Sequence, residues 1–468
     1  MKTIAFHNLG CKVNSYELDV MQQIMQEKGY EIVPFDQKAD IYVINTCTVT
    51  NIADRKSRQM LHRAKQKNPA AVVVAVGCYV QTDLAGACKD PAIDLAIGNN
   101  RKKDIAEILE QYLAEHDLDG SEDKTLGGTT VLDIAHEYEY EEMQLKTTAE
   151  HTRAYVKIQD GCNQFCSYCA IPLARGRVRS RKSEDVLREI RGIVDAGYKE
   201  IVLTGIHVSS YGIDFAKNIA EGESEISDYR GETRLFDLIE QIHEIPGLER
   251  IRVSSLEPRI VTNETAKRLA ALPKVCPHFH LSLQSGCDET LKRMNRHYTA
   301  QQYFESVQAL REAYAPRVPA ITTDVIVGFP GETEEEFAKC RAFLEKVGFY
   351  EMHVFKYSKR AGTRAAVMPN QIPEETKAAR SDILLDLERE QSIAFRKAKL
   401  GQTELVLMEE IKEIDGKPYL LGHTMDYVRV AIPVTGAETK DRSGEILRLG
   451  LQDFLTEDIL LGLETDLF

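Results

Sequence analysis

Short apolar runs alternate with amphipathic stretches over the first 100 residues of the chain. The apolar runs are Thr3–His7, Ile41–Asn45, Ala71–Val76 and Ile93–Ile97, and helical periodicity fills Asn14–Lys28 and Ile52–Lys67 between the first three. Strands that are separated by helices pair in parallel through right-handed crossovers. The pattern therefore predicts an α/β protein whose N-terminal domain, residues 1–115, is a doubly wound parallel sheet.

The alternation resumes after an acidic connector at residues 116–150, which has room for at most one strand. Strands are expected at Ala154–Ile158, Glu200–Leu203, Arg250–Val253, His278–Leu283, Ile321–Val327 and Glu351–Tyr357, and helices at Ser183–Ala196, Arg234–Glu244, Asn263–Leu272, Ala300–Ala313 and Glu332–Val347. Six such strands predict a partial (β/α)6 barrel over residues 151–395. In barrels of this kind the chemistry lies on the loops that follow the strands.

The last part of the chain changes character twice. A charged stretch, Pro373–Lys399, has the composition of a helix, and the roughly 70 residues after it alternate apolar and polar positions, as in Thr403–Met408 and Tyr427–Ile432. Strict alternation over short segments is typical of strands with one buried face. Residues 400–468 are therefore expected to form a small β-barrel.

Composition and charge narrow the class of protein. The 468 residues are 43% hydrophobic and 28% charged, which is ordinary for a folded globular chain. The formal net charge of −14 argues against a nucleic-acid partner only until it is placed along the chain, because residues 116–150 carry −8 and residues 214–232 carry −4. The near-neutral remainder contains a dense basic segment, Arg175–Lys182, so a polyanionic partner stays possible.

The chain is expected to be a cytoplasmic protein without membrane association. Its first ten residues lack the apolar core of a signal peptide, and its longest apolar run, Ala70–Val76, is far shorter than the ~20 residues of a membrane span. Ten cysteines in a reducing compartment are expected to be thiols rather than disulfides. Their spacing must show what they do.

Three cysteines share one short loop directly after the first strand of the predicted barrel. Cys162, Cys166 and Cys169 are spaced CxxxCxxC. Three thiolates on one loop can hold three irons of a 4Fe-4S cluster and leave the fourth iron open. The alternative is a zinc site, which needs a fourth ligand that no neighbouring Cys or His supplies. The spacing and its placement resemble those of the radical S-adenosylmethionine (SAM) superfamily.

In that superfamily the open iron binds SAM, and one electron cleaves SAM to a 5′-deoxyadenosyl radical. The resemblance implies that SAM contacts come from later strand ends and from the loop itself. The expected residues are Tyr168, Thr204, Gly205, His207, Gln284, Gly328, Pro330 and Gly331. Gly and Pro after a strand are more often simple turn formers, so these motifs alone would be weak.

Three further cysteines follow three strands of the N-terminal domain. Cys11, Cys47 and Cys78 come after the first, second and third predicted parallel strands. The carboxyl ends of parallel strands meet at one edge of the sheet, which is the usual ligand crevice of open α/β folds. These thiols are expected to converge on a second site, although buried unrelated cysteines are the alternative. The other cysteines, Cys88, Cys276, Cys287 and Cys340, show no such placement and are expected to be structural.

Several segments in order along nearly the whole chain resemble the methylthiotransferase family of radical SAM enzymes. They are LGCKVN from Leu9, NTCTVT from Asn45, VGC from Val76, the loop Cys162–Cys169 and LSLQSG from Leu281. The tail is similar to the TRAM domain, which binds RNA in that family. Known members attach a methylthio group to C2 of a modified adenosine at tRNA position 37, or to an aspartate of a ribosomal protein.

The resemblance implies two 4Fe-4S clusters and two uses of SAM. Cys162, Cys166 and Cys169 would hold the radical-generating cluster, and Cys11, Cys47 and Cys78 an auxiliary cluster whose open iron carries sulfide or persulfide sulfur. SAM would act both as methyl donor and as radical source. A monomer served by an electron donor such as flavodoxin or ferredoxin is also implied.

Within the family, the chain is most similar to the branch acting on N6-threonylcarbamoyladenosine of tRNA. GCKVN, NTCTVT, LTGIHVSSYG and RGRVRSR carry this similarity. The isopentenyladenosine branch usually has glutamine after the first cysteine and Gly-Gln-Asn in place of Gly205-Ile206-His207. The branch acting on a ribosomal protein is disfavoured because the basic segment suggests phosphate contacts.

The RNA contacts are predicted from two segments. Arg175, Arg177, Arg179 and Arg181 alternate and would project from one face of an extended segment, where with Lys182 they could clamp phosphates at the barrel mouth. Tyr427 and Arg429, on an alternating strand of the tail, could stack on a base and bind a phosphate. A solvated basic loop and a neutral barrel surface are the alternatives, and a non-catalytic RNA-binding protein with zinc or structural clusters is the rival function.

Overall fold

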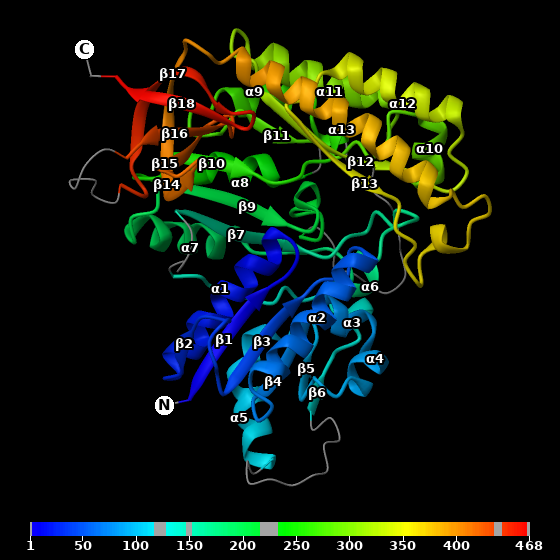
Figure 1. Cartoon of the computed structure of the whole chain (residues 1–468), viewed down its shortest axis with the longest axis vertical. Coiled ribbons are helices and arrows are strands. Elements are labelled where there is room, and N and C mark those ends of the chain that lie inside the picture. The colour runs from blue at the N-terminus through cyan, green and yellow to red at the C-terminus, as the bar shows by residue number, and fades with distance from the viewer. Residues whose placement is uncertain (1, 117–127, 147–151, 216–232, 435–441, 466–468) are drawn as a thin grey trace.

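Figure 1 shows the computed structural model of the chain, with a parallel sheet at the bottom, an open β/α barrel above it and a small β-barrel at the upper left. The structure describes residues 2–116, 128–146, 152–215, 233–434 and 442–465. Within these ranges no helix has both the length and the apolar character needed to cross a membrane. The predicted α/β fold class with a C-terminal barrel is confirmed.

The N-terminal sheet has six parallel strands in the order β2-β1-β3-β4-β5-β6. The strands are β1 (Thr3–Asn8), β2 (Glu31–Val33), β3 (Ile41–Thr46), β4 (Val72–Gly77), β5 (Leu95–Ile97) and β6 (Gly128–Thr130). The helices are α1 (Lys12–Glu27), α2 (Asn51–Lys67), α3 (Cys78–Thr82), α4 (Leu84–Lys89) and α5 (Ile105–Glu115). Strands β3 and β4 are buried on both faces, as their unbroken apolar runs predict.

The two edge strands show where sequence patterning is weak. Strand β2 has no buried residue, so it left no apolar run to predict it. Strand β6 lies inside the acidic connector and pairs with β5, through Leu95 and Gly128 among others. This part of the connector therefore continues the N-terminal sheet.

The central part contains the six predicted parallel strands and one short extra strand. They are β7 (Arg153–Asp160), β8 (Arg179–Ser180), β9 (Glu200–Gly205), β10 (Arg250–Val253), β11 (His278–His280), β12 (Ala320–Val327) and β13 (Glu351–Lys356). They form two ladders, β10-β9-β7-β8 and β11-β12-β13, in which only β8 is antiparallel. Parallel bridges such as Ile251 to Val275 join the ladders into one open barrel.

Helices cover the outer face of this barrel and create its core. They are α7 (Ser183–Asp195), α8 (Leu235–His243), α9 (Asn263–Ala270), α11 (Ala300–Tyr314) and α12 (Glu334–Val347). Alternate strand residues such as Phe279, Ile321 and Val325 pack against them in one buried cluster. Because side chains alternate along a strand, the residues between these positions face the barrel interior.

The tail is the closed five-stranded barrel that its alternation predicts, in the order β14-β15-β16-β18-β17. Its strands are β14 (Thr403–Ile414), β15 (Lys417–Thr424), β16 (Arg429–Pro433), β17 (Ile446–Thr456) and β18 (Ile459–Glu464), and helix α13 (Glu374–Lys397) precedes it. Two arginines of β10 hold it to the central barrel. Arg250 donates to the carbonyl oxygens of His423 (3.0 Å) and Leu405 (2.7 Å), and Arg252 donates to that of Met425 (3.1 Å).

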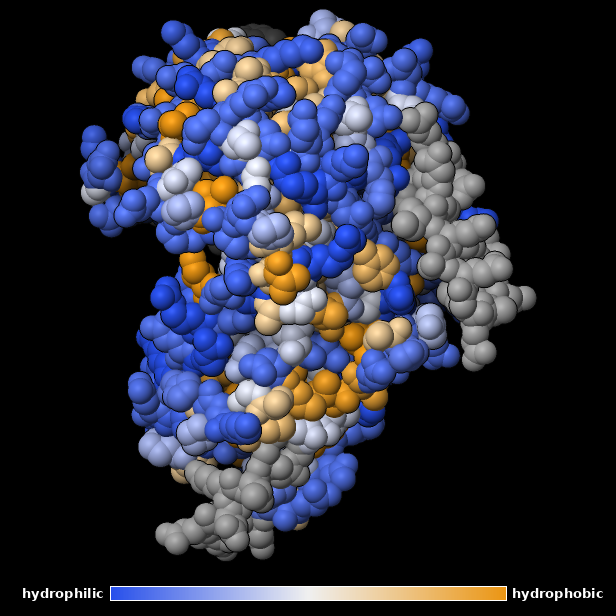
Figure 2. Space-filling model, turned by 90° about the vertical axis from the view of Figure 1, so that its right-hand side faces the viewer, coloured by the Kyte–Doolittle hydropathy of each residue, from blue (hydrophilic) through white to orange (hydrophobic). Residues whose placement is uncertain are grey.

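Seen from the right-hand side of Figure 1, the surface is largely hydrophilic, with apolar residues gathered in the middle and lower part of this face (Figure 2). Several large apolar side chains are exposed on segments close to the predicted cysteine sites. They are Val49, Ile52, Phe165, Leu173 and Val367. The surroundings of those cysteines thus combine apolar surface with the buried charges described below.

Candidate active site

The cysteine loop follows β7, and its path depends on a close approach of main chain. Gly161 has a φ of +70°, and a Cβ atom there would lie 1.7 Å from the carbonyl oxygen of Arg177. Only glycine fits this position. The N–H of Cys162 donates to the carbonyl of Gly176 at 3.0 Å. The loop is therefore folded back against the end of the short helix α6 (Ile171–Arg175).

Each sulfur of the loop accepts one N–H hydrogen bond. The donors are the main chain of Gln164 for Cys162 (3.5 Å), the main chain of Ile171 for Cys169 (3.4 Å) and the Nη1 of Arg296 for Cys166 (3.3 Å). Burial raises the pKa of Cys162 well above its ordinary value and that of Cys169 to about 12, and the neighbouring thiols of the loop reinforce the shift. A cationic metal group is what would stabilise these thiolates.

The second group of cysteines converges at the carboxyl edge of the N-terminal sheet, as expected. Cys11 precedes α1, Cys47 follows β3, and Cys78 is the first residue of α3. A Cβ atom on Gly10, which has a φ of +117°, would lie 3.2 Å from Cys47 Sγ. Burial raises the pKa of Cys47 to about 11, with contributions from the charges of both Cys78 and Cys11. The three thiols are thus close enough to influence one another.

The spacing of the sulfurs bears on which metal group they could hold. A tetrahedral zinc with Zn–S bonds of ~2.3 Å would hold its sulfurs about 4 Å apart. Among the described residues, the only three Cys, His, Asp or Glu ligand atoms that lie mutually within 4.8 Å are those of His280, Asp324 and His353. Each cysteine group instead offers three thiol sulfurs, and thiolates are the ligands that hold iron–sulfur clusters.

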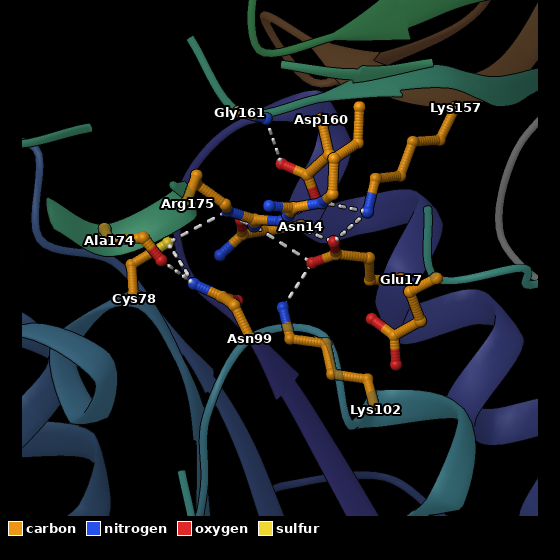
Figure 3. A network of polar contacts seen from close by, with 12 residues as sticks. Asn14, Glu17, Cys78, Asn99, Lys102, Lys157, Asp160, Gly161, Ala174 and Arg175 are labelled. Atoms are coloured by element: carbon orange, nitrogen blue, oxygen red, sulfur yellow. Dashed lines mark hydrogen bonds and ion pairs between the residues drawn. The ribbon is translucent and has the colours of Figure 1, made fainter. Parts of the chain in front are cut away.

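A buried network of charges lies between Cys78 and Gly161, the residue that precedes Cys162 (Figure 3). The guanidinium of Arg175 donates through Nε to Cys78 Sγ at 3.3 Å and through Nη1 to Glu17 at 2.5 Å. Lys102 also bonds Glu17, and Lys157 lies 2.7 Å from Glu17 and 2.6 Å from Asp160. These five charged side chains are 4% exposed or less.

The network corrects the predicted phosphate clamp. Arg175, Arg179 and Arg181 are buried, with exposures of 0%, 0% and 1%. Arg179 faces Asp160 (3.8 Å), and Arg181 is bonded by Glu189 and Glu142. The prediction that they bind RNA phosphates is wrong, because the segment turns inward and each guanidinium neutralises a buried carboxylate. Arg177 and Lys182 are exposed, and their role in RNA binding stays a prediction.

The predicted base-stacking role of Tyr427 also needs correction. This residue precedes β16 with a φ of +70°, so it is not on the alternating strand. Its ring is stacked with those of His278 (5.0 Å between centroids) and His423 (4.5 Å), and Arg252 lies 4.6 Å from its centroid. The ring therefore belongs to the contact between the two barrels. Arg429 is exposed, and its phosphate contact is untested.

Some of the residues expected to contact SAM lie beside the cysteine loop. The ring of Tyr168 meets that of Phe329 edge to face at 6.2 Å, which places the Gly328–Gly331 segment beside the loop. Arg293 strengthens this contact, because its Nε donates to Pro330 O (3.1 Å) and its own carbonyl accepts from Ser167 Oγ (2.8 Å).

On the opposite ladder, His207 and Thr204 lie at the end of β9. The N–H of His207 donates to Gln159 Oε1 at 2.8 Å, and burial lowers the pKa of its imidazole to about 4, so the ring is neutral at physiological pH. Thr204 is buried, and a Cβ atom on Gly205 would lie 3.0 Å from the carbonyl oxygen of Gln159. Gln284 has a φ of +70° and bridges to Val325.

Sequence reasoning missed several residues that touch the cysteines or complete their surroundings. Arg296 contacts Cys166, and Asn99 donates to Cys78 Sγ at 3.5 Å and to Ala174 O at 2.7 Å. Glu17 lies in the amphipathic helix α1 and showed no pattern of its own. Its only signal was a carboxylate three residues after Asn14, on the same face of a helix that begins at a cysteine.

Comparison with known proteins gives the class of this chain. Residues 156–344 match the radical SAM superfamily, and residues 3–98 match the family described as uncharacterized protein family UPF0004. Among solved structures, the radical SAM methyltransferase TsrM from Kitasatospora setae superposes with a TM-score of 0.54 over 78% of this chain and 77% of that one, at 15% identity. The chain has the fold of a radical SAM enzyme.

Sequence relatives define the family. The threonylcarbamoyladenosine tRNA methylthiotransferase of Bacillus subtilis is 40% identical, covering 96% of this chain and 93% of the relative. That of Aquifex aeolicus is 37% identical over 89% and 95%. The tRNA-2-methylthio-N(6)-dimethylallyladenosine synthase of Carboxydothermus hydrogenoformans is 34% identical over 87% and 88%. The chain belongs to the methylthiotransferase family of radical SAM enzymes, which implies a 4Fe-4S cluster and SAM.

Proposed function

We propose that this protein adds a methylthio group to C2 of N6-threonylcarbamoyladenosine at position 37 of tRNA. The relatives that carry this activity in their names match the chain at up to 40% identity over nearly its whole length. The observation that carries the proposal is the pairing of two three-cysteine sites across one buried network. Arg175 contacts Cys78 of one site and lies on the helix that follows the cysteine loop of the other.

Each of the two sites has its own three cysteines and its own function. We assign Cys162, Cys166 and Cys169 to the 4Fe-4S cluster that binds SAM, and Cys11, Cys47 and Cys78 to a second 4Fe-4S cluster that carries sulfide or persulfide. When bound, the first cluster and SAM supply the radical and the second supplies the sulfur. Arg296 and Arg175 each donate to one ligand sulfur, which fixes Cys166 and Cys78 in place.

Substitution of single cysteines tests this division. Cys166→Ala should abolish 5′-deoxyadenosine formation from SAM under reducing conditions. Cys47→Ala should still form 5′-deoxyadenosine but no methylthio product, because it disturbs only the second site. Cys88→Ala, an exposed cysteine on α4, is the matched control. Full methylthiolation by the Cys47 variant would refute the assignment of the second site.

The substrate is tested by mass spectrometry of nucleosides from tRNA of a strain lacking this protein, beside its parent. The proposal expects loss of 2-methylthio-N6-threonylcarbamoyladenosine with accumulation of its unthiolated precursor. If 2-methylthio-N6-isopentenyladenosine is lost instead, the protein belongs to the branch that acts on isopentenyladenosine of tRNA. If every methylthio nucleoside of tRNA is unchanged, a ribosomal-protein aspartate becomes the substrate to test.

Three further expectations accompany this function. We propose that the protein acts in the cytoplasm as a monomer, and that flavodoxin or ferredoxin supplies its electrons. The domain limits at 115, 150 and 395 are likewise proposed. Size-exclusion chromatography with light scattering tests the monomer. Reduction of the clusters by each purified donor tests the source of electrons.

A further inference from the structure

Three polar side chains meet inside the central barrel, on three neighbouring strands. His280 lies on β11, Asp324 on β12 and His353 on β13, and one ligand atom of each lies within 4.8 Å of the other two. The strand register brings them together, because Asp324 pairs directly with His353 and His280 pairs with Thr322. None of them is among the residues assigned to the clusters or to SAM.

Strand alternation shows that these side chains face the barrel interior. Their neighbours Phe279, Val325 and Met352 pack into the core formed with the outer helices. The residues between those positions must therefore point the other way. His280 and Asp324 are half-buried and His353 is exposed, as expected of groups that line an open lumen.

The polar atoms of the group are oriented by the protein. His280 Nδ1 is hydrogen-bonded with the Thr322 hydroxyl at 3.1 Å. The imidazole rings of His280 and His353 are stacked, with their centroids 5.9 Å apart. His280 Nε2 is buried, lies 3.5 Å from Asp324 Oδ2 and makes no hydrogen bond within the described part of the chain. The nearest polar atom to this nitrogen is thus in the Asp324 carboxylate, and the side chains of Asp324 and His353 form the accessible part of the group.

The groups around Asp324 favour its ionised form. Burial alone would raise the pKa of Asp324, but His280, His353 and the side chain of Gln284 hold it below its ordinary value. The group therefore offers a carboxylate that accepts hydrogen bonds and two imidazoles that can donate them. Asp324 lies four residues before Gly328 on β12, about 13 Å deeper along the strand. The site thus lies below the Gly328–Gly331 segment and beside Gln284, whose main-chain N–H donates to the carbonyl oxygen of Asp324 at 2.8 Å.

We propose that His280, Asp324 and His353 bind the polar N6 substituent of the target adenosine and select it over an apolar one. This inference rests on the proposed function. A threonylcarbamoyl group carries a carboxylate, a hydroxyl and amide N–H groups, which match imidazole donors and a carboxylate acceptor. An isopentenyl group would offer no hydrogen-bond partner to the remaining polar atoms of Asp324 and His353, and a site built to hydrogen-bond a polar group rejects an analogue that lacks it.

The test measures binding of anticodon stem-loops to the cluster-loaded protein. The probes carry N6-threonylcarbamoyladenosine, N6-isopentenyladenosine or adenosine at the target position. Wild type should bind the threonylcarbamoyl probe at least tenfold more tightly than either other probe. His353→Leu and the near-isosteric Asp324→Asn should each lose most of that preference, while their affinity for the adenosine probe stays within twofold. His62→Leu, on the exposed face of α2, is the matched control.

The outcomes separate this inference from the proposed function. If wild type shows no preference for the threonylcarbamoyl probe, the proposed substrate is wrong. If wild type shows it and both variants keep it, the recognition site is wrong and the substrate stands. Equal weakening of all three probes would show a general RNA contact and also refute the site. Metal analysis completes the test. If the wild-type protein contains one equivalent of zinc and Asp324→Asn does not, the three side chains form a metal site and not a substrate site.

Discussion

The charge of Glu17 should be the most costly single charge to remove from this protein. Glu17 is 1% exposed and is surrounded by Lys102, Lys157 and Arg175, which are as deeply buried. Glu17→Gln keeps the shape of the side chain but leaves three buried cations with Asp160 as their main remaining counter-charge. Removing one partner from a buried ion pair costs roughly 3–5 kcal/mol. We expect a loss of that size in the free energy of unfolding at pH 7.

The loss of stability in Glu17→Gln should also depend on pH. Burial by itself would raise the pKa of Glu17, but Arg175, Lys102 and Lys157 outweigh it and hold the pKa well below its ordinary value. A carboxylate with a depressed folded-state pKa stabilises fully above its unfolded-state pKa of ~4.3, and that stabilisation is lost as the pH falls toward the folded-state value. The difference between wild type and Glu17→Gln should therefore be largest at pH 7 and shrink below about pH 4.

The assay is urea unfolding of the cluster-loaded proteins, followed by circular dichroism at several pH values. Glu27→Gln is the matched control, since Glu27 lies on the same helix but pairs with Lys146 at the surface. Exposed pairs contribute at most about 1 kcal/mol, so this variant should behave as wild type. A cost of under 1 kcal/mol for Glu17→Gln, or a cost that is the same at pH 7 and at acid pH, would refute the reasoning.

Two further substitutions test the surroundings of the clusters. Gly161→Ala should prevent the cysteine loop from closing, because the added Cβ atom would overlap the Arg177 carbonyl. The variant should have low iron content after reconstitution and an unchanged circular dichroism spectrum. Normal iron content would contradict this prediction. Arg296→Gln should lower the reduction potential of the SAM-binding cluster, and Arg175→Gln that of the second cluster, because each loses a cationic donor to one ligand sulfur. Redox titration followed by electron paramagnetic resonance distinguishes the two clusters, and a shift of both potentials by either variant would contradict this pairing.

The fold was largely predictable from the sequence because its central strands are buried on one or both faces. Strands such as β3 and β4 appear as unbroken apolar runs, and their helices as clear amphipathic periods. The exceptions are short edge strands. Strand β2 buries no residue and β6 follows a long acidic stretch, so neither carries an apolar signal.

The site was predictable where local spacing determines it and not where tertiary contacts do. All six cysteines come after the carboxyl ends of parallel strands, so the convergence of Cys11, Cys47 and Cys78 could be inferred from topology. The arginines after the loop were misinterpreted because their spacing is the same for a solvated strand and for a buried one. What decides between the two is the carboxylates of Glu17, which is distant in sequence, and of Asp160 and Glu189, which flank the arginine segment but whose orientation toward it depends on the fold.

The way in which Arg250 and Arg252 hold the C-terminal barrel has a consequence for how such tails diversify. All four of their hydrogen-bond acceptors in the barrel, at Leu405, His423, Thr424 and Met425, are main-chain carbonyl oxygens. A carbonyl oxygen is present whatever side chain its residue bears. Substitutions at barrel positions that point away from the central domain can therefore accumulate without loosening these bonds, while Glu404, Asp426 and Tyr427, whose side chains contact the central domain, must be kept.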